Sequence, residues 1–214
     1  MMATTHVLSG LVLAAAVATV EPAFAGVAAV AAIGGGLVPD LDVIASHRKT
    51  LHFPVYYSAL AVPATLFALV APSVATVGLA VFVCTAALHA VADWFGGGLE
   101  LKPWQGESNR AVYSHYHGRW LEPRPLIGYD GSPGDLALAA VLSVPVLFVF
   151  DGAIRTVVVA LLVVSIGYAT LRKPVATVLE RIAEGGAKFV GGRPPAGRTS
   201  DASDDREQRS GGGR

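Results

Sequence analysis

Long stretches without charged residues constrain this 214-residue chain more than any other feature. Residues 54–88 contain no Asp, Glu, Lys or Arg, and residues 7–39 contain only Glu21. A bilayer core about 30 Å thick is crossed by roughly 20 mostly apolar residues in a helix, and a helix in lipid satisfies its own backbone hydrogen bonds. Only 15% of the residues are charged, against about 25% in soluble domains. We therefore predict an all-α, polytopic helical membrane protein.

Helix-breaking residues divide the apolar stretches into pairs. Glu21-Pro22, Ala71-Pro72-Ser73 and Asp151-Gly152 each interrupt one stretch with a short turn. We predict about six apolar helices in three hairpins, near residues 4–20, 23–39, 54–71, 74–93, 135–150 and 154–171. Several of these segments are short for a bilayer, so an alternative is that one pair is re-entrant and does not fully span the membrane.

Basic residues predict how the chain is oriented. The connections after the second and fourth segments are rich in Lys and Arg, whereas those after the first, third and fifth carry only Arg155. Because positive residues stay in the cytoplasm, we expect a multi-pass protein of the plasma or inner membrane with both termini cytoplasmic. The formal net charge of zero argues against a nucleic-acid partner and leaves the bilayer as the expected one. Alternatively, Ala23-Phe24-Ala25 resembles a signal-peptidase site, and cleavage there would remove His6.

The C-terminal part has a different character. Apolar residues recur at helical spacing over about 175–184, beside Glu180, Arg181 and Glu184, which predicts a short helix along the membrane surface. Residues 185–214 become rich in Gly, Arg, Ser and Asp and are expected to be a disordered polar tail. The predicted organisation is thus a helical membrane domain over 1–184, whose ligand-bearing part is 1–135, followed by the tail.

Ionisable residues gather at the edges of the apolar segments. Each predicted hairpin leaves one face of the membrane and returns to it, so these residues are all expected on the same side: His6, Asp40, Asp42, His47, His52, His89 and Asp93. His89 and Asp93 are four residues apart and share one face of a helix. Ionisable groups inside a membrane bundle are costly and usually functional.

The mixture of imidazoles and carboxylates predicts a metal site. These ligands suit zinc, manganese or iron, while the single cysteine, Cys84, excludes a cysteine-based zinc site within one chain. Taken singly, His6 fits a helix cap, Asp40 and Asp42 fit a turn, and His89 with Asp93 fit an ordinary hydrogen-bonded pair. Whether His47, or His115 and His117 in the long loop, also bind metal is left open.

The sequence resembles the YdjM-type family of membrane-bound metal-dependent hydrolases. The resemblance rests on Thr5-His6, Pro39-Asp40-Leu41-Asp42, the stretch from His47 to His52, and His89 with Asp93. Leu51 between Thr50 and His52 departs from the family pattern. More distantly, the order of histidines and aspartates is similar to that of the zinc-dependent phospholipase C and single-strand nuclease group. These resemblances imply a metal-dependent hydrolase that holds zinc.

Together these observations predict a hydrolase at the cytoplasmic membrane surface that cleaves an ester or phosphate ester of a lipid-like substrate. One or two divalent ions, expected to be Zn²⁺, would be bound by His6, Asp40, Asp42, His52, His89 and Asp93. Asp40 or Asp42 would act as general base, and His47 and Arg48 would stabilise a developing oxyanion. The competing interpretation is a non-catalytic protein, either a divalent-cation transporter or a metal-stabilised structural protein.

Overall fold

The computed structural model describes residues 1–190, with side chains through residue 184. The described chain is mostly helical, as predicted, and its six α-helices are α1 (Ala3–Val20), α2 (Ala25–Leu37), α3 (Pro54–Val70), α4 (Val74–Ala92), α5 (Pro133–Val149) and α6 (Gly152–Val190). The chain divides into two compact units, Met1–Ala176 and Thr177–Arg214. The first unit contains α1 to α5 and the first part of α6, and the second begins within α6.

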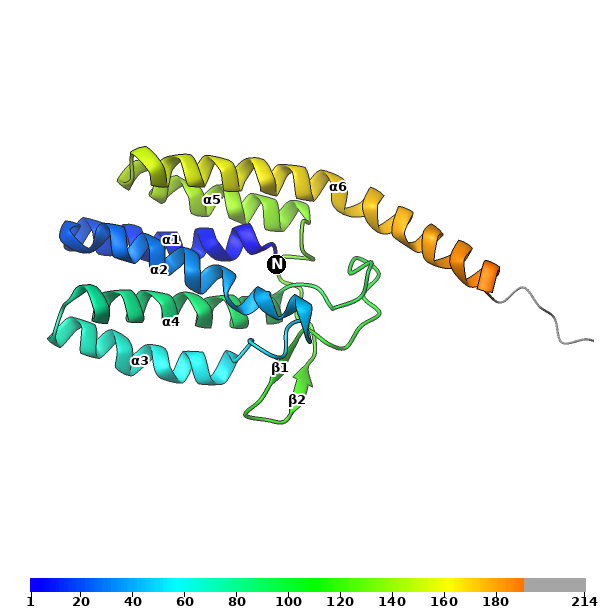
Figure 1. The fold of residues 1–214 in the computed structure, drawn as a ribbon, viewed down its shortest axis with the longest axis horizontal. Helices are drawn as coiled ribbons and strands as arrows, with labels where there is room; N and C mark the ends of the chain where they lie inside the picture. The colour runs from blue at the N-terminus through cyan, green and yellow to red at the C-terminus, as the bar shows by residue number, and fades with distance from the viewer. Residues whose placement is uncertain (191–214) are drawn as a thin grey trace, which may run out of the picture. The chain divides into compact units, whose positions relative to one another are not determined.

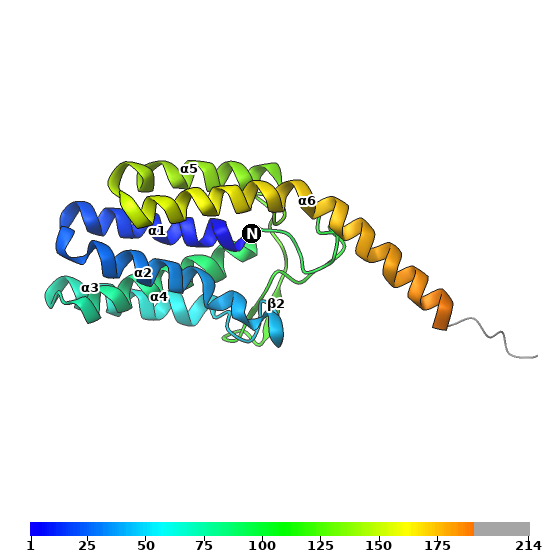
Figure 2. The same cartoon turned by 45° about the horizontal axis from the view of Figure 1, so that its top comes forward.

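The helices of the first unit run alongside one another (Figures 1 and 2). Helix α1 packs on α2, α4 and α5, and α4 packs on α2 and α3. Two glycines allow the backbones to approach closely, because a Cβ on Gly35 would lie 2.3 Å from the carbonyl oxygen of Phe82 and one on Gly36 would lie 2.7 Å from the Cα of Val7. Small residues at such contacts are typical of helices that associate in lipid, where close van der Waals packing holds helices together.

The predicted helix breakers act where the sequence places them. Helix α1 ends before Glu21, and a 3₁₀ turn over Pro22–Phe24 leads into α2. Ser73 caps α4 in a reciprocal pair with Thr76, and the Ser132 side chain accepts a hydrogen bond from the Asp135 backbone at the start of α5. A second 3₁₀ segment, η2 (Pro39–Ile44), follows α2, and a third, η3 (Asp93–Phe95), follows α4.

Four helical segments are long and apolar enough to cross a membrane: Ala3–Val20, Pro22–Ile44, Val74–Phe95 and Gly152–Glu184. The other two, α3 and α5, are apolar but only 17 residues long. These helices fit a membrane protein, and the number of crossings remains a prediction. Residue lengths of 17 lie at the lower limit of what spans a bilayer core.

The C-terminal prediction needs correction. A separate surface helix was expected after residue 171, and a disordered tail from residue 185, but α6 runs without interruption from Gly152 to Val190. Pro174 lies inside it. The apolar periodicity of residues 175–184 thus belongs to the continuation of the sixth segment. The remainder of the expected tail, residues 191–214, lies outside the described residues.

The long loop between α4 and α5 contains a small element that the sequence analysis did not predict. Strands β1 (Val112–Ser114) and β2 (Arg119–Leu121) form an antiparallel hairpin in which Tyr113 pairs with Trp120. The backbone N–H of Tyr113 also donates to the carbonyl of Arg48 at 2.9 Å. The hairpin therefore holds the loop that follows η2.

Candidate metal centre

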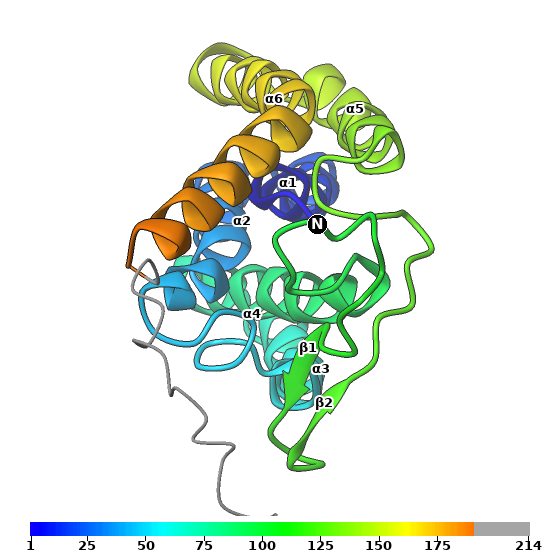
Figure 3. The same ribbon diagram turned by 90° about the vertical axis from the view of Figure 1, so that its right-hand side faces the viewer.

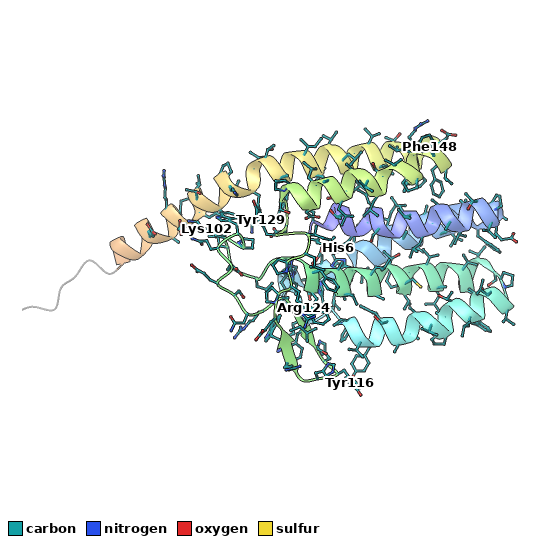
Figure 4. The ribbon with its side chains drawn as sticks, turned by 180° about the vertical axis from the view of Figure 1, so that it is seen from behind. His6, Lys102, Tyr116, Arg124, Tyr129 and Phe148 are labelled. Atoms are coloured by element: carbon teal, nitrogen blue, oxygen red, sulfur yellow. The ribbon has the colours of Figure 1, made fainter. Side chains whose placement is uncertain are left out.

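One end of the bundle collects ionisable residues from four separate parts of the chain. His6 lies near the start of α1, Asp40 in η2, His52 just before α3, and His89 and Asp93 at the end of α4. Figure 3 looks onto this end, and Figure 4 shows His6 there, with Phe148 at the opposite end of the bundle. The arrangement of the helices in antiparallel pairs thus brings these residues to the same end of the bundle.

Four side chains among the described residues direct one ligand atom each toward a common point. Asp40, His52, His89 and Asp93 form this four-residue cluster, whose ligand atoms all lie within 4.8 Å of one another. The Nε2 atom of His89 is 3.3 Å from Oδ1 of Asp40 and 3.7 Å from Oδ2 of Asp93. The Nε2 atom of His52 is 3.8 Å and 3.2 Å from the same two oxygens.

These separations match the edges of a small coordination polyhedron. Nitrogen and oxygen ligands about 2.0–2.1 Å from a tetrahedral zinc ion are roughly 3.3–3.4 Å apart. The four nitrogen–oxygen distances, from 3.2 to 3.8 Å, lie around that value, and the two remaining separations, nitrogen–nitrogen and oxygen–oxygen, are at most 4.8 Å. Two imidazoles and two carboxylates are also a donor set that suits zinc, manganese or iron. The cluster could therefore bind a divalent metal ion with little rearrangement.

His89 provides an independent indication that an ion belongs here. Its side chain is fully buried, and Nδ1 lies 2.8 Å from the carbonyl oxygen of Gly36. A carbonyl only accepts, so Nδ1 carries a proton and Nε2 is the nitrogen that faces the cluster. This buried Nε2 makes no well-aligned hydrogen bond among the described residues, and its neighbours are the carboxylate oxygens of Asp40 and Asp93 at 3.3 and 3.7 Å. Leaving a buried polar atom unpaired costs about 1–3 kcal/mol, a cost that coordination of a metal would remove.

His52 is oriented in the same way by Asp42. Nδ1 of His52 lies 2.9 Å from Oδ2 of Asp42, which leaves Nε2 facing the cluster. Metal-binding histidines commonly donate their second N–H to a carboxylate or carbonyl, which fixes the ring and its tautomer. Burial lowers the pKa of His52, but hydrogen bonds to Asp93 and Asp42 and their negative charges outweigh burial and raise the pKa above its ordinary value.

Asp42 also organises the loop that carries His52. Its two carboxylate oxygens accept hydrogen bonds from the backbone N–H groups of Arg48, Lys49 and Leu51 at 3.1 to 3.2 Å. Nδ1 of His47 lies 3.1 Å from Oδ1. With its carboxylate surrounded by these donors and turned away from the four-residue cluster, Asp42 holds His52 in place from behind.

Asp93 is the most heavily contacted residue of the cluster. Its Oδ1 atom lies 3.2 Å from Nε2 of His6 and 2.8 Å from the amino group of Met1. Its Oδ2 atom faces His52 and His89 and lies 3.3 Å from Nε of Arg48. His6 also stacks on the His89 ring with 3.7 Å between centroids. His6 therefore contacts both Asp93 and His89 but is not one of the four residues of the cluster.

Arg48 is buried beside the cluster in an unusual backbone conformation. Its side chain is 4% exposed, and Nη1 donates to the carbonyl of Gly97 at 2.8 Å. Its φ of 57° makes it the only left-handed non-glycine residue of the described chain. Strained backbone of this kind persists only where surrounding contacts impose it, and it is common at functional sites. Here the contacts with Asp42, Asp93 and Gly97 impose it.

The remaining histidines have partners elsewhere. His47 is 37% exposed and contacts Asp42. His115 lies 2.6 Å from the carbonyl oxygen of Lys49, and His117 lies 2.8 Å from the hydroxyl of Ser114. None of the three is in the four-residue cluster. His115 instead links the hairpin loop to the loop that carries His52.

Two supporting groups escaped sequence reasoning because they act through backbone carbonyls. The Gly36 carbonyl orients His89, and the Gly97 carbonyl holds Arg48. Comparisons of the chain with protein-family models, curated proteins and solved structures gave no match.

Proposed function

We propose that this chain is a membrane-bound metal-dependent hydrolase that cleaves an ester or a phosphate ester. The observation that carries the proposal is the four-residue cluster, where nitrogen and oxygen atoms from three segments stand 3.2 to 3.8 Å apart and include a buried Nε2 without a well-aligned hydrogen bond among the described residues. The resemblance of the same motifs to the YdjM-type hydrolases supports the reaction class. Zinc is the ion we propose, bound as a single ion.

Each residue of the site has a part in the proposed mechanism. Four protein ligands would fill a tetrahedral zinc ion, so in the proposed enzyme His52, His89 and Asp93 would hold the ion and Asp40 would leave the fourth position to water. A divalent ion held in this way would acidify that water molecule and polarise the bond under attack. Asp40 is the only member of the cluster with appreciable exposure, at 25% of its side chain, so it is placed to take the proton from the attacking water. Arg48 stabilises negative charge that develops in the transition state. His47, which lines the same cavity as Asp40 and Arg48, would help Arg48 to stabilise the developing oxyanion.

The basic residues near this end support a cytoplasmic site. The loops of this end carry Arg48, Lys49, Lys102, Arg110, Arg119 and Arg124, and the turns at the other end carry only Arg155. By the positive-inside rule the metal end faces the cytoplasm, as do both termini. Lys49 and Arg124 also lie over the rings of Tyr113 and Trp94, at 4.6 and 4.9 Å from the centroids. Such aromatic residues are enriched at the membrane interface.

The test is metal-dependent turnover. Protein purified in detergent is analysed for metal, stripped with a chelator and reconstituted with Zn²⁺, Mn²⁺ or Mg²⁺. Each form is then incubated with paired carboxyl esters, phosphomonoesters and phosphodiesters. We expect about one bound ion per chain and turnover that is lost on stripping and restored by one of the metals. A tightly bound ion without turnover across the panel would refute the hydrolase.

That second outcome describes the competing function, a metal that only holds helices together. The burial of His52, His89 and Asp93, none more than 1% exposed, favours it. A cation transporter has less support, because transporters place ion sites near the bilayer midplane. The buried polar residues within the middle of the described helices are hydroxyls such as Thr85 and Ser143.

A further inference from the structure

A cavity of about 340 Å³ adjoins the four-residue cluster. One wall is polar and contains Asp40, His47 and Arg48. An apolar wall is formed by Val43 of η2 and Val164 of α6, and beside it lies Tyr168, whose hydroxyl donates to Asp130, a second carboxylate of the lining. All of these residues belong to the unit Met1–Ala176. The cavity thus lies between η2 and α6.

This cavity gives a molecule access to the cluster at Asp40. Only Asp40 among the four residues is appreciably exposed, and it lines this cavity. Two larger cavities, one beside Trp104 and Tyr129 and one beside Leu13 and Cys84, are lined by none of the four residues. A substrate in this cavity would lie between Asp40 and the apolar wall.

The apolar wall continues onto the outer surface of the helices. Val43 is 68% exposed, and Val164 is 57% exposed, on a helical segment with a mean hydropathy of 2.0. If this surface lies in lipid, the cavity opens sideways into the bilayer as well as toward the loops. Ligand cavities commonly measure about 300–1,000 Å³, so this one accommodates a head group and the beginning of a chain, and the rest of a long chain must lie outside.

We infer that the substrate is an anionic long-chain amphiphile whose ester head enters between η2 and α6 while its chain remains against Val43 and Val164. The inference rests on the proposed function for the position of the reacting bond. An anionic head is favoured because the charge of Arg48 and of the divalent ion that the cluster would hold would together outweigh the carboxylates of Asp40 and Asp130 in the lining. The apolar wall excludes small hydrophilic esters as good substrates, since they gain nothing from it.

The binding step is tested with hexadecyl phosphate that carries a diazirine in its chain. The probe is photolysed with the full-length protein in phosphatidylcholine nanodiscs, and the labelled residues are mapped by mass spectrometry. Val164→Trp fills the mouth of the cavity. Val163→Trp adds the same bulk one residue away on the outer surface, which does not line the cavity. Metal content is measured in both variants to establish that the cluster is intact.

We expect labelling on η2 and around residue 164, competed by hexadecyl phosphate but not by methyl phosphate. Labelling there should fall about tenfold in Val164→Trp and stay near wild type in Val163→Trp, because about two methylenes of lost apolar contact are enough for a tenfold change. Equal labelling of the two variants, or labelling spread over all outer helix surfaces, would overturn the inference.

Turnover separates this inference from the proposed function. If the chain hydrolyses esters, Val164→Trp should lower kcat/KM for hexadecyl phosphate about tenfold and leave kcat/KM for methyl phosphate within about twofold. Equal loss on both would overturn the inference while the hydrolase stands. Labelling that depends on Val164, without turnover of any ester, would refute the hydrolase and support the cavity as an amphiphile-binding site.

Discussion

Ionisable side chains are buried at one end of the helical bundle and exposed at the other. At the metal end, seven ionisable side chains are at most 4% exposed: His6, Asp42, Arg48, His52, His89, Asp93 and Asp135. At the other end, the turns between helices carry Asp151 and Arg155, whose side chains are 89% and 54% exposed and pair with each other at 2.9 Å. Both ends connect apolar helices, so the difference is not imposed by the bundle itself.

Burial of charge explains why this difference matters. A buried ionised group costs several kcal/mol unless partners compensate for it. At the metal end almost every buried group has such partners. Asp135, for example, accepts hydrogen bonds from the backbone of Met2 and Gly131 and from the hydroxyl of Thr5. Among the described residues of this end, His89 Nε2 and Arg48 Nε are buried without a well-aligned hydrogen bond, and each lies 3.3 Å from a carboxylate oxygen of the cluster. A turn that only connects two helices needs no buried charge, and the exposed ion pair at the opposite end is the arrangement with the lower free-energy cost.

The largest expected effect comes from removing a ligand. We predict that His89→Ala and Asp93→Ala each lower bound metal from about one ion per chain to less than about a tenth, because the polyhedron loses a corner and its remaining groups are oriented for four ligands. Metal analysis of purified protein checks this. The matched control is Asp151→Ala at the opposite end, which should keep the wild-type stoichiometry. Unchanged metal in both ligand variants would refute the site.

A smaller effect is expected from the residue that orients His52. Asp42→Asn keeps the shape of the side chain but loses the charge and one acceptor, so the His52 ring is held less firmly. Loss of such a supporting group typically weakens metal binding about 10–100-fold. Competition with a fluorescent zinc chelator measures this affinity. Thr50→Ala, an exposed change in the same loop, serves as control. A loss as complete as that in His89→Ala would instead make Asp42 a direct ligand.

The sequence was sufficient to predict that the ionisable residues gather at one end of the bundle, and to predict most members of the cluster. Apolar segments broken by Pro and Gly imply hairpins, and hairpins return His52, His89 and Asp40 to one side. It could not separate Asp40 from Asp42, because two carboxylates one residue apart look equivalent until the backbone is known. Pro39 and the 3₁₀ turn of η2 direct Asp40 to the cluster and Asp42 to the loop behind it. The Gly36 and Gly97 carbonyls were hidden because backbone acceptors have no sequence signature.

The smallest expected effect completes the contrast between the two ends. Asp151→Ala removes an exposed ion pair with Arg155, and such pairs contribute about 0–1 kcal/mol because solvent screens them and two flexible side chains must be held in place. Thermal unfolding of the metal-loaded protein in one detergent should therefore differ little between Asp151→Ala and wild type. Asp135→Ala, by contrast, leaves three buried donors unpaired and should destabilise the protein by about 1–3 kcal/mol for each. Similar unfolding temperatures for the two variants would mean that burial at the metal end carries no energetic consequence, and the contrast drawn between the two ends would fail with it.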